Sequence, residues 1–418
     1  MSIPNASRNT SDRVDLPMRA FAGGFYSNLK AMYDHLGIAY HSQPFLFEFA
    51  RAHSASHEPH GSGKRDSAYF IHASNLHQTY PPRPSGVATL SHIRETIYLL
   101  VCYTWFSICC FFVAPQIVQA SYERRMETLD DYLKRIRLPE YFVTYYLLPL
   151  ISSVTTCPHE ALLEFPASDL IEYKKRTHGA PHYTVSNGVG SVQDRLIEGI
   201  EYNLNATVSA VDPQDKGVKI SWTQVNGNKE LQYQETFDEV VLAVAPDVVG
   251  AIFEPLRRHM SRIPTTLVES VVHTDQSTLG VGGPHQAASS RKDHDAQLIR
   301  LRTSLSGRRQ TESIHVQPCG AIVTTCPFTP IDPSLTICSA KFTRVLRSPE
   351  SRSIVNSIFG YTLDVGNEKI EPWRNGDGHV WLTGGWCWDG MVLLEGCVVS
   401  ATRVAGELGV EAPWRRAR

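Results

Sequence analysis

The sequence lacks an excess of charge of either sign. Its 418 residues contain 40 Lys and Arg against 42 Asp and Glu, which leaves a formal net charge of -2. A protein that binds nucleic acid through its phosphates ordinarily carries a strongly basic surface. The balance of charge therefore predicts no nucleic-acid partner.

Paired cysteines and an apolar leader are missing as well. The nine cysteines are scattered and odd in number, and none forms a C-x-x-C pair, so neither a disulfide framework nor a metal site is predicted. The first fifteen residues are polar and lack the apolar core of a secretory signal. We expect a protein of the reducing cytoplasm.

What the sequence does contain is enough apolar material for a large core. Hydrophobic residues make up 42% of the chain and aromatic residues 10%, which argues against extensive disorder. At roughly 150 residues per domain, the length predicts two or three structural units, or one α/β body with an insertion.

One apolar run interrupts the otherwise soluble pattern. Residues 97–118 read IYLLVCYTWFSICCFFVAPQIV, which exceeds the roughly 18 apolar residues expected of a membrane span. Two interpretations stay open: a helix that is buried or leans on a membrane, which we favour, and a true span. A channel for a hydrophobic substrate would give the same pattern.

The polar stretches 53–84 and 280–310 are predicted to be loops.

Local signals are clearest in the second half of the chain. Residues 207–246 alternate with a period of two, and Asn226-Gly227 predicts a hairpin turn between two strands. Near the C-terminus, Val380–Leu382 predicts a strand, Gly384-Gly385 a tight turn, and residues from Leu394 to the stop at Gly409 a helix. The unpaired amides at such a helix start favour negative charge, such as the edge of a reduced flavin. An ordinary helix packed on a sheet is the structural alternative.

Several segments resemble one enzyme superfamily. EGCVVSA (395–401) resembles the start of the C-terminal flavin-binding helix of the flavin-containing amine oxidase / phytoene desaturase superfamily. Three further segments resemble strands and a helix start of its dinucleotide domain: NATVSAV (205–211), FDEVVLAVAP (237–246) and SNGVGSVQDRL (186–196). VVHTDQSTL (271–279) and YYLLPLISSVTTCP (145–158) resemble a branch grouped with lipid-modifying enzymes.

The resemblance implies an α/β fold with an FAD/NAD(P)-binding Rossmann-like domain and a helix-rich substrate domain. Residues 1–50, 185–255 and 370–418 would form the FAD domain, and residues 51–184 and 256–369 the substrate domain. The cofactor FAD would be held noncovalently by residues carried over from the motifs: Val208, Gly384, Gly385, Trp386, Asp389, Gly390, Met391, Glu395 and Gly396.

One departure from the family pattern matters. No G-x-G-x-x-G lies on a strand–turn–helix near the N-terminus, where only Gly23-Gly24 offers paired glycines, without a preceding apolar strand. In relatives this unit holds the pyrophosphate. The FAD domain is therefore predicted to be incomplete at its N-terminus.

His273 and Asp275 are the candidate catalytic residues, because alternation after an apolar strand would place both side chains on one face. A hydrogen-bonded structural pair is the alternative for them. The sequence thus predicts an FAD-dependent oxidoreductase acting on a hydrophobic small molecule, with contact to a membrane through residues 97–118 left open. The alternative function is a flavin-free binding or scaffold protein that keeps the fold.

Overall fold

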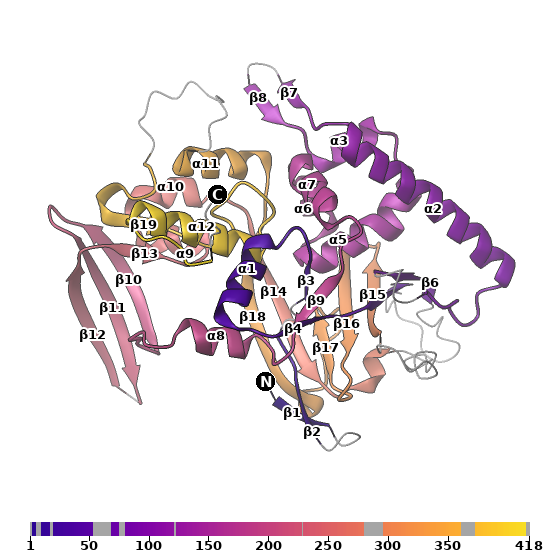
Figure 1. Ribbon diagram of the computed structural model, residues 1–418, viewed down its shortest axis with the longest axis horizontal. Coiled ribbons are helices and arrows are strands. Elements are labelled where there is room, and N and C mark those ends of the chain that lie inside the picture. Colours follow the sequence, from indigo (N-terminus) through magenta and orange to yellow (C-terminus); the bar gives the residue numbers. More distant parts are fainter. Residues whose placement is uncertain are drawn as a thin grey trace.

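A computed structural model describes residues 2–5, 10–16, 20–52, 68–74, 80–120, 123–227, 229–279, 296–360 and 373–414. The architecture is mixed α/β, as the sequence predicted, with a large sheet on one side and a smaller helical and β-meander part on the other (Figure 1). Two main hydrophobic clusters correspond to these parts.

The largest sheet has seven strands in the order β18-β14-β17-β16-β15-β5-β6. Its neighbouring strands are antiparallel except for the parallel pair β5 and β15. The strands are β5 (Phe45–Arg51), β6 (Ala68–Ala73), β14 (Thr265–His273), β15 (Gln297–Ser304), β16 (Gln310–Val316), β17 (Ile322–Thr325) and β18 (Thr336–Val345).

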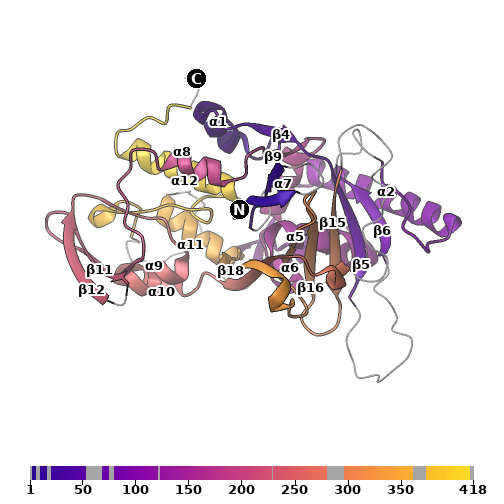
Figure 2. The ribbon, with the colours of Figure 1, turned by 90° about the horizontal axis from the view of Figure 1, so that it is seen from below.

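Helices from the middle of the chain cover one face of this sheet (Figures 1 and 2). They are α2 (Thr89–Phe112), α3 (Leu129–Arg135), α4 (Glu140–Phe142), a π-helical turn (Val143–Leu147), α5 (Leu148–Thr155), α6 (His159–Leu163) and α7 (Ala167–Thr177). A short hairpin of β7 (Ile117–Ala120) and β8 (Glu123–Met126) follows α2. The largest buried side chains of this layer, such as Tyr132, Phe142 and Tyr146, pack in the first hydrophobic cluster.

The smaller part holds a parallel pair of strands, β13 (Val240–Leu242) and β19 (Val380–Leu382). A three-stranded meander precedes it, formed by β10 (Ala206–Pro213), β11 (Val218–Asn226) and β12 (Lys229–Phe237). The helices of this part are α9 (Pro246–Ile252), α10 (Arg257–Met260), α11 (Pro349–Phe359) and α12 (Leu394–Glu407). The predicted Asn226-Gly227 hairpin and the C-terminal strand and helix are confirmed.

The N-terminal segment connects the two parts. A three-stranded antiparallel sheet joins β3 (Ala20–Ala22), β4 (Tyr40–Ser42) and β9 (His182–Val185), with α1 (Ser27–Leu36) between β3 and β4 and α8 (Gly190–Leu196) after β9. A hairpin of β1 (Ser2–Asn5) and β2 (Thr10–Arg13) precedes it. The sequence predicted no apolar strand before Gly23-Gly24. This was wrong, because the short strand β3 directly precedes the two glycines.

Other boundaries differ from the prediction. Helix α2 begins at Thr89 rather than residue 97 and ends at Phe112, because the chain turns extended at Val113 ahead of Pro115. Strands β6 and β15 lie inside the stretches 53–84 and 280–310, which composition predicted to be loops. Residues 53–67 and 280–295 of these stretches lie outside the described residues. Strand β5 belongs to the large sheet, whereas the sequence placed residues 1–50 with the cofactor domain.

Four histidines titrate far below their ordinary range because burial disfavours the charged imidazolium. Burial lowers the pKa of His72, His159 and His182 from 6.5 to about 4, and that of His315 to about 3. In the unfolded chain each takes up a proton near pH 6.5, so between pH 6.5 and 4 the unfolded state binds more protons than the native one.

We therefore expect the free energy of unfolding to be constant above about pH 7 and to fall as the pH drops from about 6.5 toward 4, by roughly 1.4 kcal/mol per pH unit for each histidine. Urea unfolding at pH 7 and pH 5 measures this. His315→Gln should reduce the pH dependence of the free energy of unfolding by the contribution of one histidine, roughly 1.4 kcal/mol per pH unit. Equal unfolding free energies at the two pH values would contradict the expectation.

Candidate functional site

In the C-terminal strand–turn–helix, the turn after β19 is hydrogen-bonded to the helix that follows it, α12. Gly384 adopts a φ of 143°, which L side chains rarely tolerate, so glycine is required at this turn. The Ser400 hydroxyl of α12 accepts a hydrogen bond from the Gly384 amide at 3.0 Å and lies 2.9 Å from the Thr383 hydroxyl. The turn is therefore pinned to the helix that follows it, and Gly385 packs against the carbonyl of Leu393.

Trp388 fills the inside of the loop between the turn and α12. A Cβ at Gly390 would lie 2.7 Å from its ring, and one at Gly396 would lie 2.4 Å from it. Its indole N–H donates to the Met391 carbonyl at 2.9 Å, and its ring meets Phe25 edge to face at 5.8 Å. These two glycines are thus required by the indole, which gives the loop its shape.

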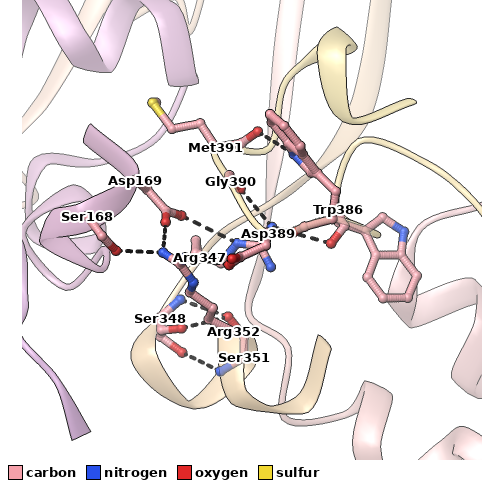
Figure 3. Close-up of polar contacts among 11 residues, drawn as sticks. Ser168, Asp169, Arg347, Ser348, Ser351, Arg352, Trp386, Asp389, Gly390 and Met391 are labelled. Atoms are coloured by element: carbon pink, nitrogen blue, oxygen red, sulfur yellow. Dashed lines mark hydrogen bonds and ion pairs between the residues drawn. The ribbon is translucent and has the colours of Figure 1, made fainter. Parts of the chain in front are cut away.

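The buried side chain of Arg347 forms hydrogen bonds to the backbone of the same loop. The Arg347 guanidinium donates to the carbonyls of Trp386, Trp388 and Gly390 at 3.3, 3.0 and 2.9 Å (Figure 3). Burial lowers the pKa of Arg347, while the Asp169 carboxylate 3.7 Å away opposes that shift. Three carbonyl groups and one carboxylate therefore fix the conformation of residues 386–390.

Arg352 extends this network to the helical layer. Its guanidinium forms ion pairs with Asp169 of α7 and Asp389 of the loop, and it donates to the Ser168 hydroxyl at 2.6 Å (Figure 3). Burial raises the pKa of the Asp169 carboxyl, and the two arginines act against that effect. The side chain of Asp389 is 40% exposed, so this carboxylate faces solvent while Asp169 does not.

A cavity of about 330 Å³ opens beside this network. Its walls come from α7, α11, the loop and the residues before α1, and it combines apolar with charged groups. The residues lining it are Phe25, Pro115, Ser168, Asp169, Ile171, Glu172, Lys175, Arg176, Arg352, Trp388, Asp389, Gly390 and Met391. Its volume is within the range of small-molecule sites.

Two kinds of polar group in this wall are available to a ligand. Within the described part of the chain, no protein acceptor bonds the amides of Gly390 and Met391. Arg176 is paired with Glu172, and Arg352 with the two aspartates. The ammonium of Lys175 has no such carboxylate partner among the described residues. The site can therefore hold an apolar ring or chain that also presents an electron-rich or anionic edge.

Glu395 lies next to this loop, but its carboxylate is bonded elsewhere. It is fully buried and accepts hydrogen bonds from the first turn of α1: from the Asn28 amide at 2.9 Å, the Asn28 side chain at 2.7 Å and the Leu29 amide at 3.0 Å. These amides are the ones a helix start offers to an anion. The protein's own carboxylate thus occupies the anion site that follows Gly23-Gly24.

The predicted catalytic pair lies apart from the cavity. His273 is buried at the end of β14, where its Nε2 lies 2.8 Å from the Thr324 hydroxyl and its Nδ1 accepts from the Asp275 amide at 3.2 Å. Asp275 accepts from the amide and hydroxyl of Ser277, which lowers its pKa, and burial lowers the pKa of His273. Neither residue lines the cavity, so the structure favours a structural pair, and catalysis by them stays a prediction.

Some of the remaining predicted cofactor residues line the cavity and others do not. Asp389, Gly390 and Met391 line the cavity, whereas Trp386 is buried and donates to the Val244 carbonyl at 3.1 Å. Val208 lies in the meander, paired with Trp222. Sequence reasoning missed five polar residues that the site uses: Asp169, Glu172, Lys175, Arg347 and Arg352.

Comparison with protein-family models gives no match, and neither does comparison with curated protein sequences. The solved structures that resemble the course of the chain include the following two. Cyclohexylamine oxidase from Brevibacterium oxydans IH-35A has a TM-score of 0.47 at 10% identity, covering 94% of this chain and 87% of its own. A putrescine oxidase triple mutant redesigned in cofactor binding has a TM-score of 0.46 at 10% identity, covering 97% and 90%. At such values the likeness assigns no activity.

Proposed function

We propose that this chain is a flavin-dependent oxidoreductase that uses FAD to oxidise a hydrophobic small molecule. The observation that carries the proposal is the cavity where the loop after β19 meets α7. There, Phe25, Trp388 and Met391 provide an apolar and aromatic wall, and no acceptor among the described residues bonds the amides of Gly390 and Met391. This combination suits a flat heteroaromatic ring with carbonyl groups on one edge.

The described residues fit the ring end of a flavin better than its nucleotide end. The anion site at the start of α1 is taken by Glu395, and β3 lies in an antiparallel sheet rather than in a βαβ unit. The pyrophosphate is therefore not assigned to any of the described residues. When bound, the flavin supplies the hydride-accepting chemistry.

The protein's own groups have three tasks in this proposal. The loop amides orient the ring edge, and Lys175 offsets negative charge that gathers there. Arg347 keeps the loop in the conformation that presents these amides. The apolar wall, with Ile171 and Met391, excludes water and receives a hydrophobic substrate.

A titration with FAD tests the proposal. We expect FAD to quench the fluorescence of the tryptophans beside the cavity and to acquire the resolved visible absorbance of a bound flavin. Riboflavin should bind within about tenfold of FAD, because the contacts offered are those of the ring end. Lys175→Ala should weaken binding of either by roughly tenfold. Lys216→Ala, on an exposed turn of the meander, is the matched control.

The second candidate is a flavin-free binding protein built on the same fold. The observation that favours it is that the protein's own groups fill the C-terminal turn: the Gly384 amide donates to the Ser400 hydroxyl, and the Trp388 ring fills the loop. Protein that stays colourless, and whose fluorescence neither FAD nor riboflavin changes, would decide for this alternative. Binding that Lys175→Ala leaves unchanged would place the flavin elsewhere.

A further inference from the structure

Helix α2 is buried on one face only. Leu99, Cys102, Phe106, Cys109 and Cys110 pack into the first hydrophobic cluster. The other face carries large apolar side chains that lie open to solvent along the whole helix: Leu90, Ile93, Ile97, Leu100, Val101, Trp105, Ile108, Phe111 and Phe112. We call these nine residues the α2 face. In both views α2 lies at the edge of the molecule (Figures 1 and 2).

The α2 face is too extensive to be incidental. Its 24-residue helix is about 36 Å long at the α-helical rise. Leu100 is 67% exposed and Phe112 is 83% exposed. Isolated exposed apolar residues are common on soluble proteins, but a continuous apolar stripe of this length marks a surface that another apolar phase covers.

By its length and composition alone, α2 is long and apolar enough to cross a membrane. Its buried face argues against spanning. To cross a bilayer, α2 would have to leave the core and expose Cys102, Phe106 and Cys110 together with the side chains packed on them. A helix with one face in the protein and the other apolar face outward is arranged to lie in the plane of an interface.

Exposed arginines lie on α2 and next to both of its halves. Arg94 is the exposed charge of the helix itself, because the Glu95 carboxylate turns inward and accepts hydrogen bonds from the hydroxyls of Tyr141 and Tyr146. Arg83 is exposed before the helix and Arg137 beside its C-terminal half; the exposed carboxylate nearest Arg137 in sequence is Glu140.

A hollow of about 350 Å³ lies at the C-terminal half of α2. It is lined by Trp105, Cys109, Val113, Arg135, Ile136 and Arg137. The Arg135 guanidinium is already paired with Glu127 at 2.6 Å, whereas no such carboxylate pairs with Arg137 among the described residues. The Trp105 indole donates to the Ile136 carbonyl at 2.9 Å, which fixes its ring at the rim. A cation beside an apolar hollow and a tryptophan is the arrangement expected at a lipid headgroup level.

From these observations we infer that the α2 face docks on the surface of a lipid bilayer that contains anionic lipids, with α2 lying in the membrane plane. Anionic headgroups complement Arg83, Arg94 and Arg137, and acyl chains cover the apolar stripe. A second copy of the chain fits less well, because a two-fold contact through this face would bring these arginines toward one another. The inference is independent of the proposed flavin chemistry.

Vesicle sedimentation with the full chain tests the inference. One set of vesicles is phosphatidylcholine alone and the other contains about one third phosphatidylserine. We expect binding to both, tighter to the anionic set, and release by alkaline carbonate as for a surface-bound protein. Leu100→Glu should lower the partition coefficient at least about tenfold on both sets. Arg94→Glu should lower it roughly fivefold on the anionic set only.

Leu267→Glu is the matched control, because Leu267 on β14 is 69% exposed, against 67% for Leu100, and lies off the α2 face. It should bind vesicles like the wild type, and all variants should keep the wild-type circular dichroism. Three results would overturn the inference: no vesicle binding by the wild type, equal loss with Leu267→Glu and Leu100→Glu, or protein that resists carbonate extraction as a spanning helix does. Self-association that Leu100→Glu abolishes, without vesicle binding, would assign the face to a second copy instead.

Discussion

Replacing Glu395 with alanine is expected to lower the free energy of unfolding by about 4 kcal/mol. The substitution leaves the Asn28 amide, the Asn28 side chain and the Leu29 amide without the carboxylate that they bond at 2.7 to 3.0 Å. Each buried or half-buried donor left without an acceptor costs about 1–3 kcal/mol. The loss also separates α1 from α12, which pack against each other. Urea unfolding followed by circular dichroism measures the effect.

Two further variants define the cause. Glu395→Gln keeps one oxygen for Asn28 but sets an amide N–H2 against the Leu29 amide, so about half of the loss should appear. Glu407→Ala lies at the exposed end of the same helix and should change the free energy of unfolding by less than about 0.5 kcal/mol. A loss below about 1 kcal/mol for Glu395→Ala would show that the carboxylate does not hold α1 in place.

The second large effect is expected at Arg347. Arg347→Met keeps most of the side-chain volume but removes the donors that bond the carbonyls of Trp386, Trp388 and Gly390. It also leaves the buried Asp169 with Arg352 alone. Breaking a buried charged network from one side costs about 3–5 kcal/mol. We expect that loss in urea unfolding, a shifted tryptophan emission from the released loop, and weaker flavin binding.

Lys341→Met is the control for Arg347→Met, since Lys341 lies on β18 with an exposed side chain 3.9 Å from Glu269. Such a loose surface pair is worth at most about 1 kcal/mol. Arg347→Lys should recover part of the stability, because an ammonium reaches fewer of the three carbonyls than a planar guanidinium does. If Arg347→Met kept the stability and the tryptophan emission of the wild type, Arg347 would not be what holds residues 386–390 in place.

Features set by neighbouring residues could be predicted from the sequence. The Asn226-Gly227 hairpin, the strand at 380–382 and the helix from Leu394 follow from turn chemistry and periodicity, which act within a few residues. The limits of α2 could not be predicted in this way. Hydropathy marks where apolar residues cluster, whereas the helix includes the more polar turn from Thr89 because its backbone bonds continue there.

Features that join distant segments were beyond the sequence. The parallel pairing of β5 with β15 links residues about 250 positions apart, and β15 lies in a stretch whose composition predicted a loop. Likewise, nothing near Asp169 or Arg347 in the sequence indicates that their charged groups lie 3.7 Å apart in the fold. Glu395 was predicted from a motif to hold a cofactor, and its partners on α1 lie 366 and 367 positions away.

That last separation has a consequence for synthesis. Helix α1 leaves the ribosome well before α12, because the carboxylate that completes the first turn of α1 is made some 367 residues later. At about 5–20 residues per second, the helix waits tens of seconds for its partner. During that interval the apolar side of α1, with Leu29 and Tyr33, has no α12 to cover it. We therefore expect the nascent chain to expose this apolar surface until translation passes Glu395, and to be prone to aggregation during that interval.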